Sequence, residues 1–303
     1  MAYEERIFLI GATGNTGKPL VYKLLANPKV ALTFYTRSPS KIHELYGNQP
    51  DGKVEIVEGD YSNLKPFEDS IPGHSRMFFV IRLFDFKTIA STTRAFAEKA
   101  YSAGVEQIVF VSGIVASTPW RAAIASPVGR QVEESILTIP NRKSFVALRS
   151  AYFMTNQIMV HSGDVHTVKN ANKIVDIRNE DETKPWISPK DIGEIAANIL
   201  LDPIEKHGDA VYELIGDPRT PKEHADILSC VLGRKIVYEK ITEEQSYETM
   251  IKAGTPHLFV FNGIQLSGML LNLPITPGIS ILLGRPPQTL EQWVEENKSV
   301  FLQ

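Results

Sequence analysis

"LIGATGNTGKPL", residues 9–20, places Gly11, Gly14 and Gly17 between an apolar run and a segment with a helical pattern. Glycine lets the chain turn sharply after a strand, lets a pyrophosphate approach the backbone, and lets the next helix pack closely against the sheet. The N-terminus of that helix presents unpaired N–H groups and a positive dipole end to the phosphates. The stretch predicts a dinucleotide-binding loop, and the alternative is an ordinary turn between a strand and a helix. The loop residues assigned to the cofactor are Gly11, Thr13, Gly14, Asn15, Thr16 and Gly17.

Short runs rich in Val, Ile and Phe recur along the first half of the chain. They lie at 6–10, 30–36, 54–60, 77–81, 107–113 and 144–150. Runs that are apolar at nearly every position are typical of strands buried on both faces of a parallel sheet. The segments between them have helical patterns, at 17–27, 39–47, 64–71, 86–103 and 127–139. This alternation predicts an α/β fold, a Rossmann-type doubly wound parallel sheet with helices on both faces.

The residues that follow the second strand indicate which cofactor is bound. A protein that prefers NAD usually has Asp or Glu there for the ribose hydroxyls, whereas this chain has Arg37, Ser38 and Lys41. A guanidinium group offers a planar pair of donors to a 2′-phosphate, and serine adds a hydroxyl. We therefore expect NADP(H) rather than NAD, with a solvated basic loop as the alternative. Asp60 and Tyr61, after the third strand, can either contact the adenine or form a turn.

The alternation of strands and helices loosens after residue 150. A helical pattern at 191–203 and a strand pattern at 210–216 follow, and then a helix, a strand and a helical C-terminal segment. We expect an NADP-binding domain and a smaller C-terminal α/β lobe that binds the substrate. The first covers 1–150, completed by 189–216, and the second covers 151–188 and 217–303.

Composition and charge limit the classes of function. The 303 residues include 32 Lys and Arg against 35 Asp and Glu, a formal charge of −3 with no block of like charge, which argues against nucleic acid as a partner. Cys230 is the only cysteine, which excludes intrachain disulfides and CxxC metal sites, and the seven histidines are too scattered to predict a metal site. The N-terminal segment is acidic, unlike a secretion signal, and the apolar stretch 258–273 is interrupted by polar residues. We expect a cytoplasmic protein that acts on a small molecule and does not enter a membrane.

The motifs together resemble those of the NmrA-like group of atypical short-chain dehydrogenases/reductases. They are GATGNTG (11–17), TRSPSK (36–41), GDYSN (59–63), AGVEQIVFVSG (103–113), LRSAYFMTN (148–156) and WISPKDIGEIAANILLDP (186–203). The ending, LGRPPQTLEQWVEENKSVF (283–301), is also similar to fungal members of secondary metabolism that act as festuclavine synthase-type reductases. The resemblance implies a Rossmann domain that binds NADP(H), with a small lobe over the nicotinamide. It implies cofactor contacts from Val80, Ile81, Arg82, Phe153 and Asn156.

The usual catalytic pair of the broader class is missing. In Tyr-x-x-x-Lys, lysine lowers the pKa of tyrosine so that the phenol can protonate a carbonyl oxygen, but the corresponding segment 126–136 has neither residue. Family members without the tyrosine often keep a lysine three residues before a Val-Glu pair, where this chain has Gly129 followed by Arg130. Arg130 can bind an anionic substrate or stabilise an oxyanion, but it does not donate a proton near neutral pH.

Other side chains are candidates for the predicted cleft. Ser112 matches a serine that lies beside the nicotinamide in the family, and it can orient a substrate or simply end its strand. Tyr152 is a candidate proton donor or a wall residue. The substrate contacts expected from loops and from the segment between the lobes are Phe84, Trp120, Met154 and Trp186, with a cationic spot at Arg82.

We expect an NADPH-dependent reductase of a small imine or iminium, activated alkene or quinone. Hydride transfer to such electrophiles depends chiefly on proximity and can proceed without a Tyr-Lys pair. One alternative is a non-catalytic NADP(H) sensor that engages a protein partner, as regulatory NmrA-like members do. Another is a redox-neutral isomerase or cyclase.

Overall fold

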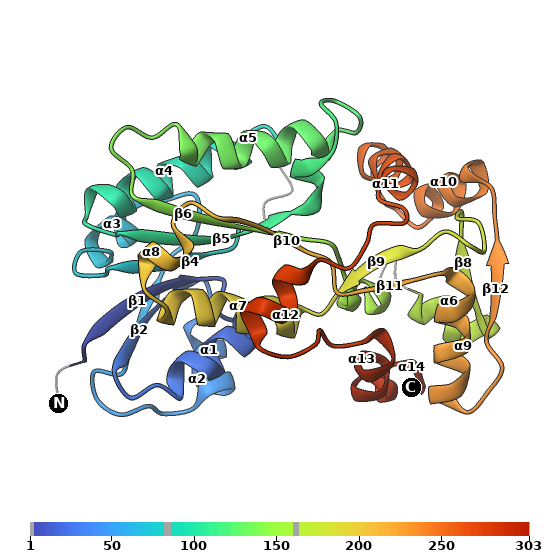
Figure 1. Cartoon of the computed structure of the whole chain (residues 1–303), viewed down its shortest axis with the longest axis horizontal. Helices are drawn as coiled ribbons and strands as arrows, with labels where there is room; N and C mark the ends of the chain where they lie inside the picture. The colour runs from blue at the N-terminus through green and yellow to red at the C-terminus, as the bar shows by residue number, and fades with distance from the viewer. Residues whose placement is uncertain (1–2, 82–85, 160–163, 303) are drawn as a thin grey trace. The chain divides into compact units, whose positions relative to one another are not determined.

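The computed structural model describes residues 3–81, 86–159 and 164–302. By its internal contacts the chain divides into two units, both drawn in Figure 1. Unit 1 comprises residues 1–116, 127–149 and 192–213. Unit 2 comprises residues 117–126, 150–191 and 214–303.

Unit 1 is built around a seven-stranded sheet with the order β10-β6-β5-β4-β1-β2-β3. Its strands are β1 (Glu5–Ile10), β2 (Val30–Thr36), β3 (Val54–Glu58), β4 (Arg76–Phe79), β5 (Gln107–Gly113), β6 (Ser144–Ser150) and β10 (Val211–Leu214). The ladders β3–β2, β2–β1, β1–β4 and β4–β5 are parallel, and Ile7 of β1 lies opposite Leu32 on one side and Arg76 on the other. The central strands are apolar at nearly every position because both faces of the sheet are covered.

Helices cover both faces of this sheet. They are α1 (Gly17–Leu25), α2 (Pro39–Tyr46), α3 (Lys65–Ser70), α4 (Ile89–Ser102), α5 (Ala125–Leu137), α7 (Pro189–Leu201) and α8 (Ile204–His207), with the 3-10 helix η1 (Ile114–Ser117) after β5. Figure 1 shows α3, α4 and α5 on one face, and α1, α2 and α7 on the other. On the first face, Phe67 and Phe96 pack with Phe79 in an apolar cluster. The doubly wound α/β fold predicted from the sequence is confirmed.

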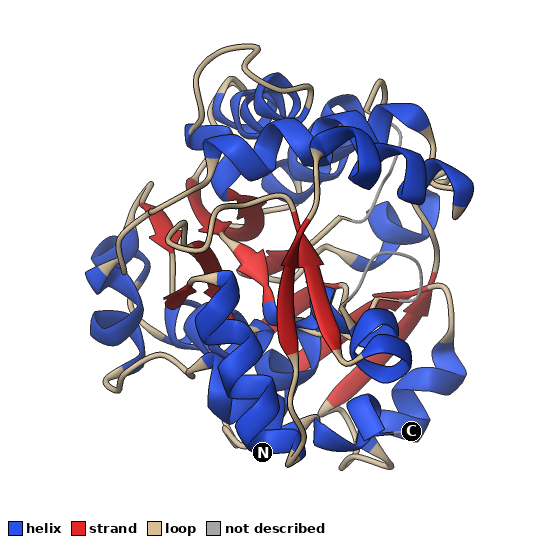
Figure 2. Cartoon of the chain, turned by 90° about the vertical axis from the view of Figure 1, so that its right-hand side faces the viewer, coloured by secondary structure: helices blue, strands red, loops and turns tan. Residues whose placement is uncertain are grey.

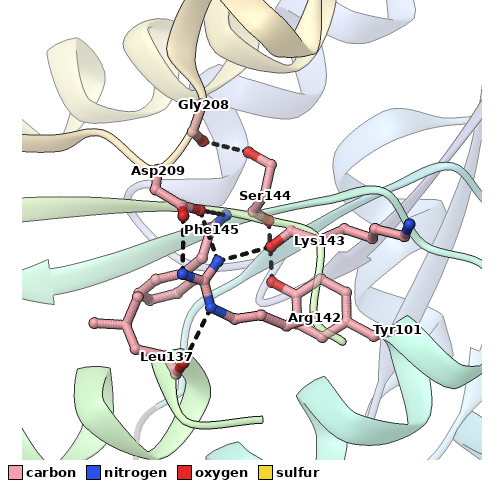
Figure 3. Close-up of polar contacts among 8 residues, drawn as sticks. All are labelled: Tyr101, Leu137, Arg142, Lys143, Ser144, Phe145, Gly208 and Asp209. Carbon is pink, nitrogen blue, oxygen red and sulfur yellow. Dashed lines mark hydrogen bonds and ion pairs between the residues drawn. The ribbon is translucent and has the colours of Figure 1, made fainter. Parts of the chain in front are cut away.

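Polar contacts hold the start of β6. Arg142 forms a bidentate ion pair with Asp209, with Nη1–Oδ1 and Nη2–Oδ2 distances of 2.7 and 2.8 Å (Figure 3). The Nε of Arg142 donates to the carbonyl oxygen of Leu137 at the end of α5, at 3.1 Å. Tyr101, near the end of α4, donates to the carbonyl oxygen of Ser144 at 3.0 Å. These bonds fix the C-terminal ends of α4 and α5 to the sheet.

Unit 2 contains two small sheets. The three-stranded sheet has the order β11-β9-β7, and in the two-stranded one β8 and β12 run parallel, side by side (Figure 2). The strands are β7 (Tyr152–Phe153), β8 (Lys173–Asp176), β9 (Lys184–Ile187), β11 (Asp217–Arg219) and β12 (Val237–Lys240). In β9, Trp186 lies opposite Tyr152 of β7 and opposite Asp217 of β11.

Short helices complete unit 2. They are η2 (Met154–Ile158, a 3-10 helix), α6 (Val165–Ala171), α9 (Pro221–Leu232), α10 (Glu243–Lys252), α11 (His257–Met269), α12 (Pro277–Leu283), α13 (Leu290–Glu296) and α14 (Lys298–Leu302). Helices α9, α10 and α13 begin at capping boxes, in which a threonine and the Glu or Gln three residues later satisfy two N–H groups. Their core includes Trp186, Leu228, Trp293 and Phe301. In the described part of the chain, no helix has the length and apolar character needed to cross a bilayer.

Candidate functional site

The glycine loop lies where the order of the strands reverses. From β1 the chain proceeds to β2 and β3 on one side, and from β4 it proceeds to β5, β6 and β10 on the other. In open α/β sheets, ligands bind in the crevice beyond the carboxyl ends of the strands at this point. Gly11 follows β1 there and Val80 follows β4, and the N–H of Val80 donates to the carbonyl oxygen of Ile10 at 3.3 Å.

Two of the three glycines are required by close contacts. Gly11 has a φ of +98°, and a Cβ added to it would lie 2.1 Å from Cγ1 of Val80. A Cβ on Gly17 would lie 2.2 Å from the carbonyl oxygen of Gly11, so this glycine lets α1 approach the end of β1. At Gly14 the nearest atom would be 3.3 Å away, which is tight but less restrictive. The loop therefore has the turn and the close packing that a pyrophosphate cradle needs.

The N-terminus of α1 faces this loop. Helix α1 begins at Gly17, and its N-cap residue Thr16 makes no side-chain capping hydrogen bond. Inside the loop, the N–H of Gly14 donates to the carbonyl oxygen of Gly11 at 3.1 Å. N–H groups in the first turn of a helix combine with the dipole to favour a phosphate. Thr13 and Asn15, also predicted as cofactor contacts, belong to the same loop.

A cavity of about 90 Å³ adjoins the loop at the ends of three strands. It is lined by residues 10–13 at the end of β1, 35–37 at the end of β2, and 59–61 just after β3. Tyr35 fixes the turn after β3, because its hydroxyl donates to the carbonyl oxygen of Asp60 at 2.8 Å. Burial raises the pKa of Tyr35 to about 12, so the phenol stays neutral. The sequence-predicted contacts Gly11, Thr13, Arg37, Asp60 and Tyr61 are brought together at this cavity.

Arg37 lies at the rim of the cavity with an exposed side chain. It forms no hydrogen bond or ion pair with the residues that the structure describes. The N–H of neighbouring Ser38 donates to Oγ1 of Thr36 at 3.1 Å, and Ser38 is the N-cap of α2. Lys41, in the first turn of α2, is also exposed. A guanidinium group with its donors unused is available to a phosphate.

Asp60 holds the turn after β3. Its Oδ1 accepts from the hydroxyl and the N–H of Ser62 at 2.7 and 2.8 Å. These hydrogen bonds, with a smaller effect of Arg37, lower the pKa of Asp60. Tyr61 donates to the carbonyl oxygen of Val80 at 3.4 Å, so it links the turn to the end of β4. Ile81 packs against the apolar cluster, whereas Arg82 and Phe84 lie outside the described residues.

Ser112 lies in a buried polar group at the end of β5. Its hydroxyl donates to Oε1 of Glu133 at 2.5 Å, and Glu133 is only 3 % exposed. Arg149 donates to the same carboxylate through Nε at 3.0 Å and Nη2 at 2.6 Å. The hydrogen bond to Glu133 raises the pKa of Arg149, which is fully charged. The three residues therefore form a hydrogen-bonded network between β5, α5 and β6.

The structure gives a steric reason for the missing lysine. A Cβ on Gly129 would lie 3.2 Å from Cγ2 of Val115 and 3.3 Å from the backbone nitrogen of Ala116. Helix α5 thus passes close to η1 at this position, and a side chain here requires the neighbouring atoms to shift by a few tenths of an ångström. Arg130, the next residue of α5, is half-buried.

In unit 2, Tyr152 packs among aromatic and cationic neighbours. Its ring meets that of Trp186 at 6.5 Å, and Nζ of Lys184 lies 4.8 Å from the ring centroid of Tyr152. Burial raises the pKa of Tyr152, and a hydrogen bond with Ser267 opposes the shift. The phenol therefore stays protonated near neutral pH.

The other sequence-predicted residues of unit 2 differ in exposure. Met154 is fully buried and Trp186 is 1 % exposed, so both side chains belong to the core of unit 2. Trp120 is 57 % exposed. Phe153 and Asn156 are half-buried at η2.

Sequence reasoning missed Glu133, Arg149 and Lys184. A Val-Glu pair drew attention to the segment around Glu133, but its partners are 21 and 16 residues away in the chain. The charged Lys184 precedes proline and looks like part of a turn. Only its position two residues before Trp186 indicates that the two side chains lie on the same face of a strand.

The residues of unit 1 fit a dinucleotide. Gly11 and Gly17 leave no room for a Cβ, α1 begins at the loop, and exposed Arg37 borders a cavity. Fold and site together define an α/β protein of the dinucleotide-binding class.

Residues 11–203, more than half of the chain, match the model of an NAD(P)H-binding family. The chain therefore belongs to the NAD(P)H-binding family, which confirms its resemblance to the NmrA-like atypical short-chain dehydrogenases/reductases and the prediction of a nicotinamide cofactor.

Two curated relatives and one solved structure are similar over much of the chain. The prestalk A differentiation protein A of Dictyostelium discoideum is 25 % identical over 97 % of this chain and 92 % of its own length. Festuclavine synthase II of Penicillium roqueforti is 26 % identical over 70 % of this chain and 72 % of its own. The NADPH-dependent quinone oxidoreductase of Escherichia coli, solved with NADPH, has a TM-score of 0.78 at 19 % identity, over 96 % of this chain and 99 % of that one. At that identity the last comparison shows the fold alone.

Proposed function

We propose that this protein is an NADPH-dependent reductase of a small conjugated electrophile, such as a quinone, an activated alkene or an iminium. The observation that carries the proposal is Arg37, exposed and unpaired among the described residues, at the rim of the cavity beyond β2. An acidic residue at the end of β2 would bind the ribose hydroxyls of NAD, whereas Arg37 with Ser38 suits a 2′-phosphate. The quinone oxidoreductase that shares the fold is named as NADPH-dependent, which supports both the cofactor and the reaction class.

Each part of the cofactor has a group of this chain that suits it. The N-terminus of α1 holds the pyrophosphate, and Gly11 lets it approach the backbone. Arg37 and Lys41 hold the 2′-phosphate. When bound, NADPH supplies a hydride. The Ser112–Glu133–Arg149 network holds the end of β5 in place, next to β4 and the point where the order of the strands reverses.

Electrophiles that already carry charge or conjugation suit this protein best. Reduction of a simple ketone needs an acid that protonates the carbonyl oxygen as it gains negative charge. Gly129, which has no side chain to do this, occupies the position where family members often have a lysine. The Ser112 hydroxyl proton is directed to Glu133. An iminium or a quinone accepts hydride with less need of a positioned acid.

The test is a titration of the purified chain with NADPH, NADP, NADH and NAD by calorimetry. Turnover of a cyclic imine, an enone and a quinone is then followed by loss of the reduced-nicotinamide absorbance. We expect NADPH and NADP, which carry the 2′-phosphate, to bind at least about 10-fold more tightly than NADH and NAD. We also expect faster turnover of these electrophiles than of simple ketones. Efficient reduction of ketones alone contradicts the proposal.

The second candidate is an NADP(H) sensor that acts on a partner protein. It is favoured by the engaged hydroxyl of Ser112, by glycine in place of lysine at position 129, and by similarity to a protein named for differentiation. A sensor binds NADP and NADPH with clearly different affinities and gives a flat absorbance trace with every electrophile. A redox-neutral isomerase or cyclase gives the same flat trace but converts its substrate while the cofactor is bound.

A further inference from the structure

A second group of charged side chains lies inside unit 2, in residues that the predicted cofactor site does not use. Lys184 is on β9, Asp164 precedes α6, and Asp176 and Arg178 are at and just beyond the end of β8. We call this group the Lys184 cluster, and it consists of Asp164, Asp176, Arg178 and Lys184 with the rings of Tyr152 and Trp186 beside it.

The ammonium group of Lys184 has aromatic neighbours but no close acceptor. Its Nζ lies 4.5 Å from the ring centroid of Trp186 and 4.8 Å from that of Tyr152. Asp164 and Asp176 are near enough to affect its pKa, yet among the described residues it has no ion pair within 4.0 Å. Ring faces satisfy an ammonium only in part, because each cation–π contact replaces little of its hydration. Burial lowers the pKa of Lys184 accordingly.

Two buried donors beside Lys184 also lack an acceptor. Arg178 is 5 % exposed and gives Nε and Nη2 to Asp176 at 3.1 and 2.6 Å, but its Nη1 has no partner in the described part of the chain. Trp186 is 1 % exposed, and its Nε1 is likewise without an acceptor among those residues. A buried donor without an acceptor destabilises the folded state, and native proteins rarely leave one without a reason.

The remaining polar neighbours do not supply that acceptor. Asp176 is committed to Arg178, which also donates its backbone N–H to it at 3.1 Å. His224 bonds to Oε1 of Gln157 through Nε2 at 2.6 Å, and burial lowers its pKa to about 3, so the ring is neutral. The hydroxyl of Tyr152 is bonded to Ser267. The ammonium of Lys184, Nη1 of Arg178 and Nε1 of Trp186 therefore have no bonded acceptor among the described residues.

Two side chains of the cluster are partly open to solvent, and one of them borders a cavity. The side chains of Lys184 and Asp164 are half-buried rather than sealed from solvent. Asp164 also lines a cavity of about 720 Å³ bounded by α6, β8, β12 and α10, with Val175, Ile241 and Met250 in its wall. The cavity has room for the apolar body of a ligand.

We propose that the Lys184 cluster binds a small organic oxyanion, a carboxylate or an ionised hydroxyl on a conjugated ring, through Lys184, Arg178 Nη1 and Trp186 Nε1. Charge-assisted donors to an oxyanion are the strong kind of hydrogen bond, and they satisfy the groups that the chain leaves unmatched. The proposal concerns binding and goes beyond the proposed reduction, which does not depend on it.

The pH dependence follows from the groups that face Lys184. Burial raises the pKa of Asp164 to about 6 despite the charge of Lys184. Burial opposes ionisation of Asp176, but Lys184 and Arg178 outweigh it and lower that pKa to about 2. Tyr152 and His224 are neutral between pH 5.5 and 8. An incoming anion favours protonated Asp164 and charged Lys184, so affinity should rise as pH falls through about 6.

The experiment is calorimetric titration of the full chain with two matched probes. They are 2-hydroxy-1,4-naphthoquinone, which is ionised at neutral pH, and the neutral 2-methyl-1,4-naphthoquinone, with 2-naphthoate in parallel as the carboxylate. We expect one of the two oxyanions to bind at least about 10-fold more tightly than the neutral quinone. Lys184→Met should abolish that preference, and Lys184→Arg, which keeps the cation, should retain most of it. Lys190→Met, an exposed lysine of the same unit, is the matched control.

The outcomes separate this inference from the proposed function. Urea unfolding of each variant, measured in the same buffer, reports whether the chain is folded. Three outcomes overturn the oxyanion site: equal binding of the ionised and neutral probes, binding of neither probe, or full retention of the preference in Lys184→Met. They do so even if the protein oxidises NADPH with the neutral quinone. Oxyanion binding that depends on Lys184, without turnover of any electrophile, keeps the site and contradicts the reductase.

Discussion

The hydroxyl of Ser112 donates to Oε1 of Glu133 at 2.5 Å, and the same carboxylate holds the guanidinium group of Arg149 at 2.6 Å. One buried carboxylate thus joins β5, α5 and β6 close to the switch point of the sheet. Because the serine proton is directed to Glu133, Ser112 is better placed to position β5 than to donate to a substrate.

Glu133→Gln should therefore destabilise the protein more than Ser112→Ala does. The glutamine removes the charge that Arg149 holds at 2.6 Å and leaves Glu213, at 4.0 Å, as a more distant counter-charge. Breaking a buried ion pair costs about 3 kcal/mol, whereas the serine variant loses one hydrogen bond worth about 1 kcal/mol. Urea unfolding of both variants against the unmodified chain measures the difference. Equal and small losses would show that the ion pair does not hold the three elements together.

Gly11→Ala should destabilise the chain and weaken cofactor binding, and Gly104→Ala is its matched control. Both glycines have φ near +100°, so both variants incur a backbone cost of about 1 kcal/mol. Only at Gly11 does the new Cβ meet another residue, 2.1 Å from Val80, because nothing lies within 4 Å of the Cβ position of Gly104. We expect at least about 2 kcal/mol more loss in Gly11→Ala by urea unfolding. Similar losses in both variants would remove the packing argument.

Arg37→Ala should weaken NADPH binding at least about 10-fold and leave NADH binding almost unchanged, because only NADPH carries the 2′-phosphate. Lys29→Ala is a matched control, since Lys29 is exposed, pairs with Glu4 and precedes the opposite end of the same strand. Calorimetry with both cofactors measures the effect. Equal weakening of both cofactors would remove the basis for preferring NADP(H).

The sequence predicts the first half of the chain well, because there the structure follows from local patterns. The Val- and Ile-rich runs correspond to β1–β6, and the glycine spacing places the loop after β1. The parts that could not be predicted depend on residues distant in the chain. Glu133 meets Ser112 and Arg149 only because α5 packs beside β5 and β6. Likewise, Trp186 is a residue type common in the walls of ligand pockets. Its burial depends on packing against residues of α9, which are distant in the chain.

Asp164 and Asp176 should affect stability in opposite directions, although both face Lys184. The pKa of Asp164 is raised from 3.8 to about 6, so the folded state binds its proton more tightly, and that contribution is lost as pH rises from about 4 to 6. Asp164→Asn should therefore stabilise the chain by about 1–2 kcal/mol at pH 7.5 and have little effect at pH 4.5.

The pKa of Asp176 is lowered to about 2, so its contribution is present above about pH 4 and is lost as pH falls towards 2. Asp176→Asn should destabilise the chain at both pH 7.5 and pH 4.5, because Arg178 also loses its partner. Urea unfolding at the two pH values tests the contrast, and a loss of stability in Asp164→Asn at pH 7.5 would mean that Asp164 serves Lys184 as a necessary counter-ion, leaving no unmatched donor there for an oxyanion.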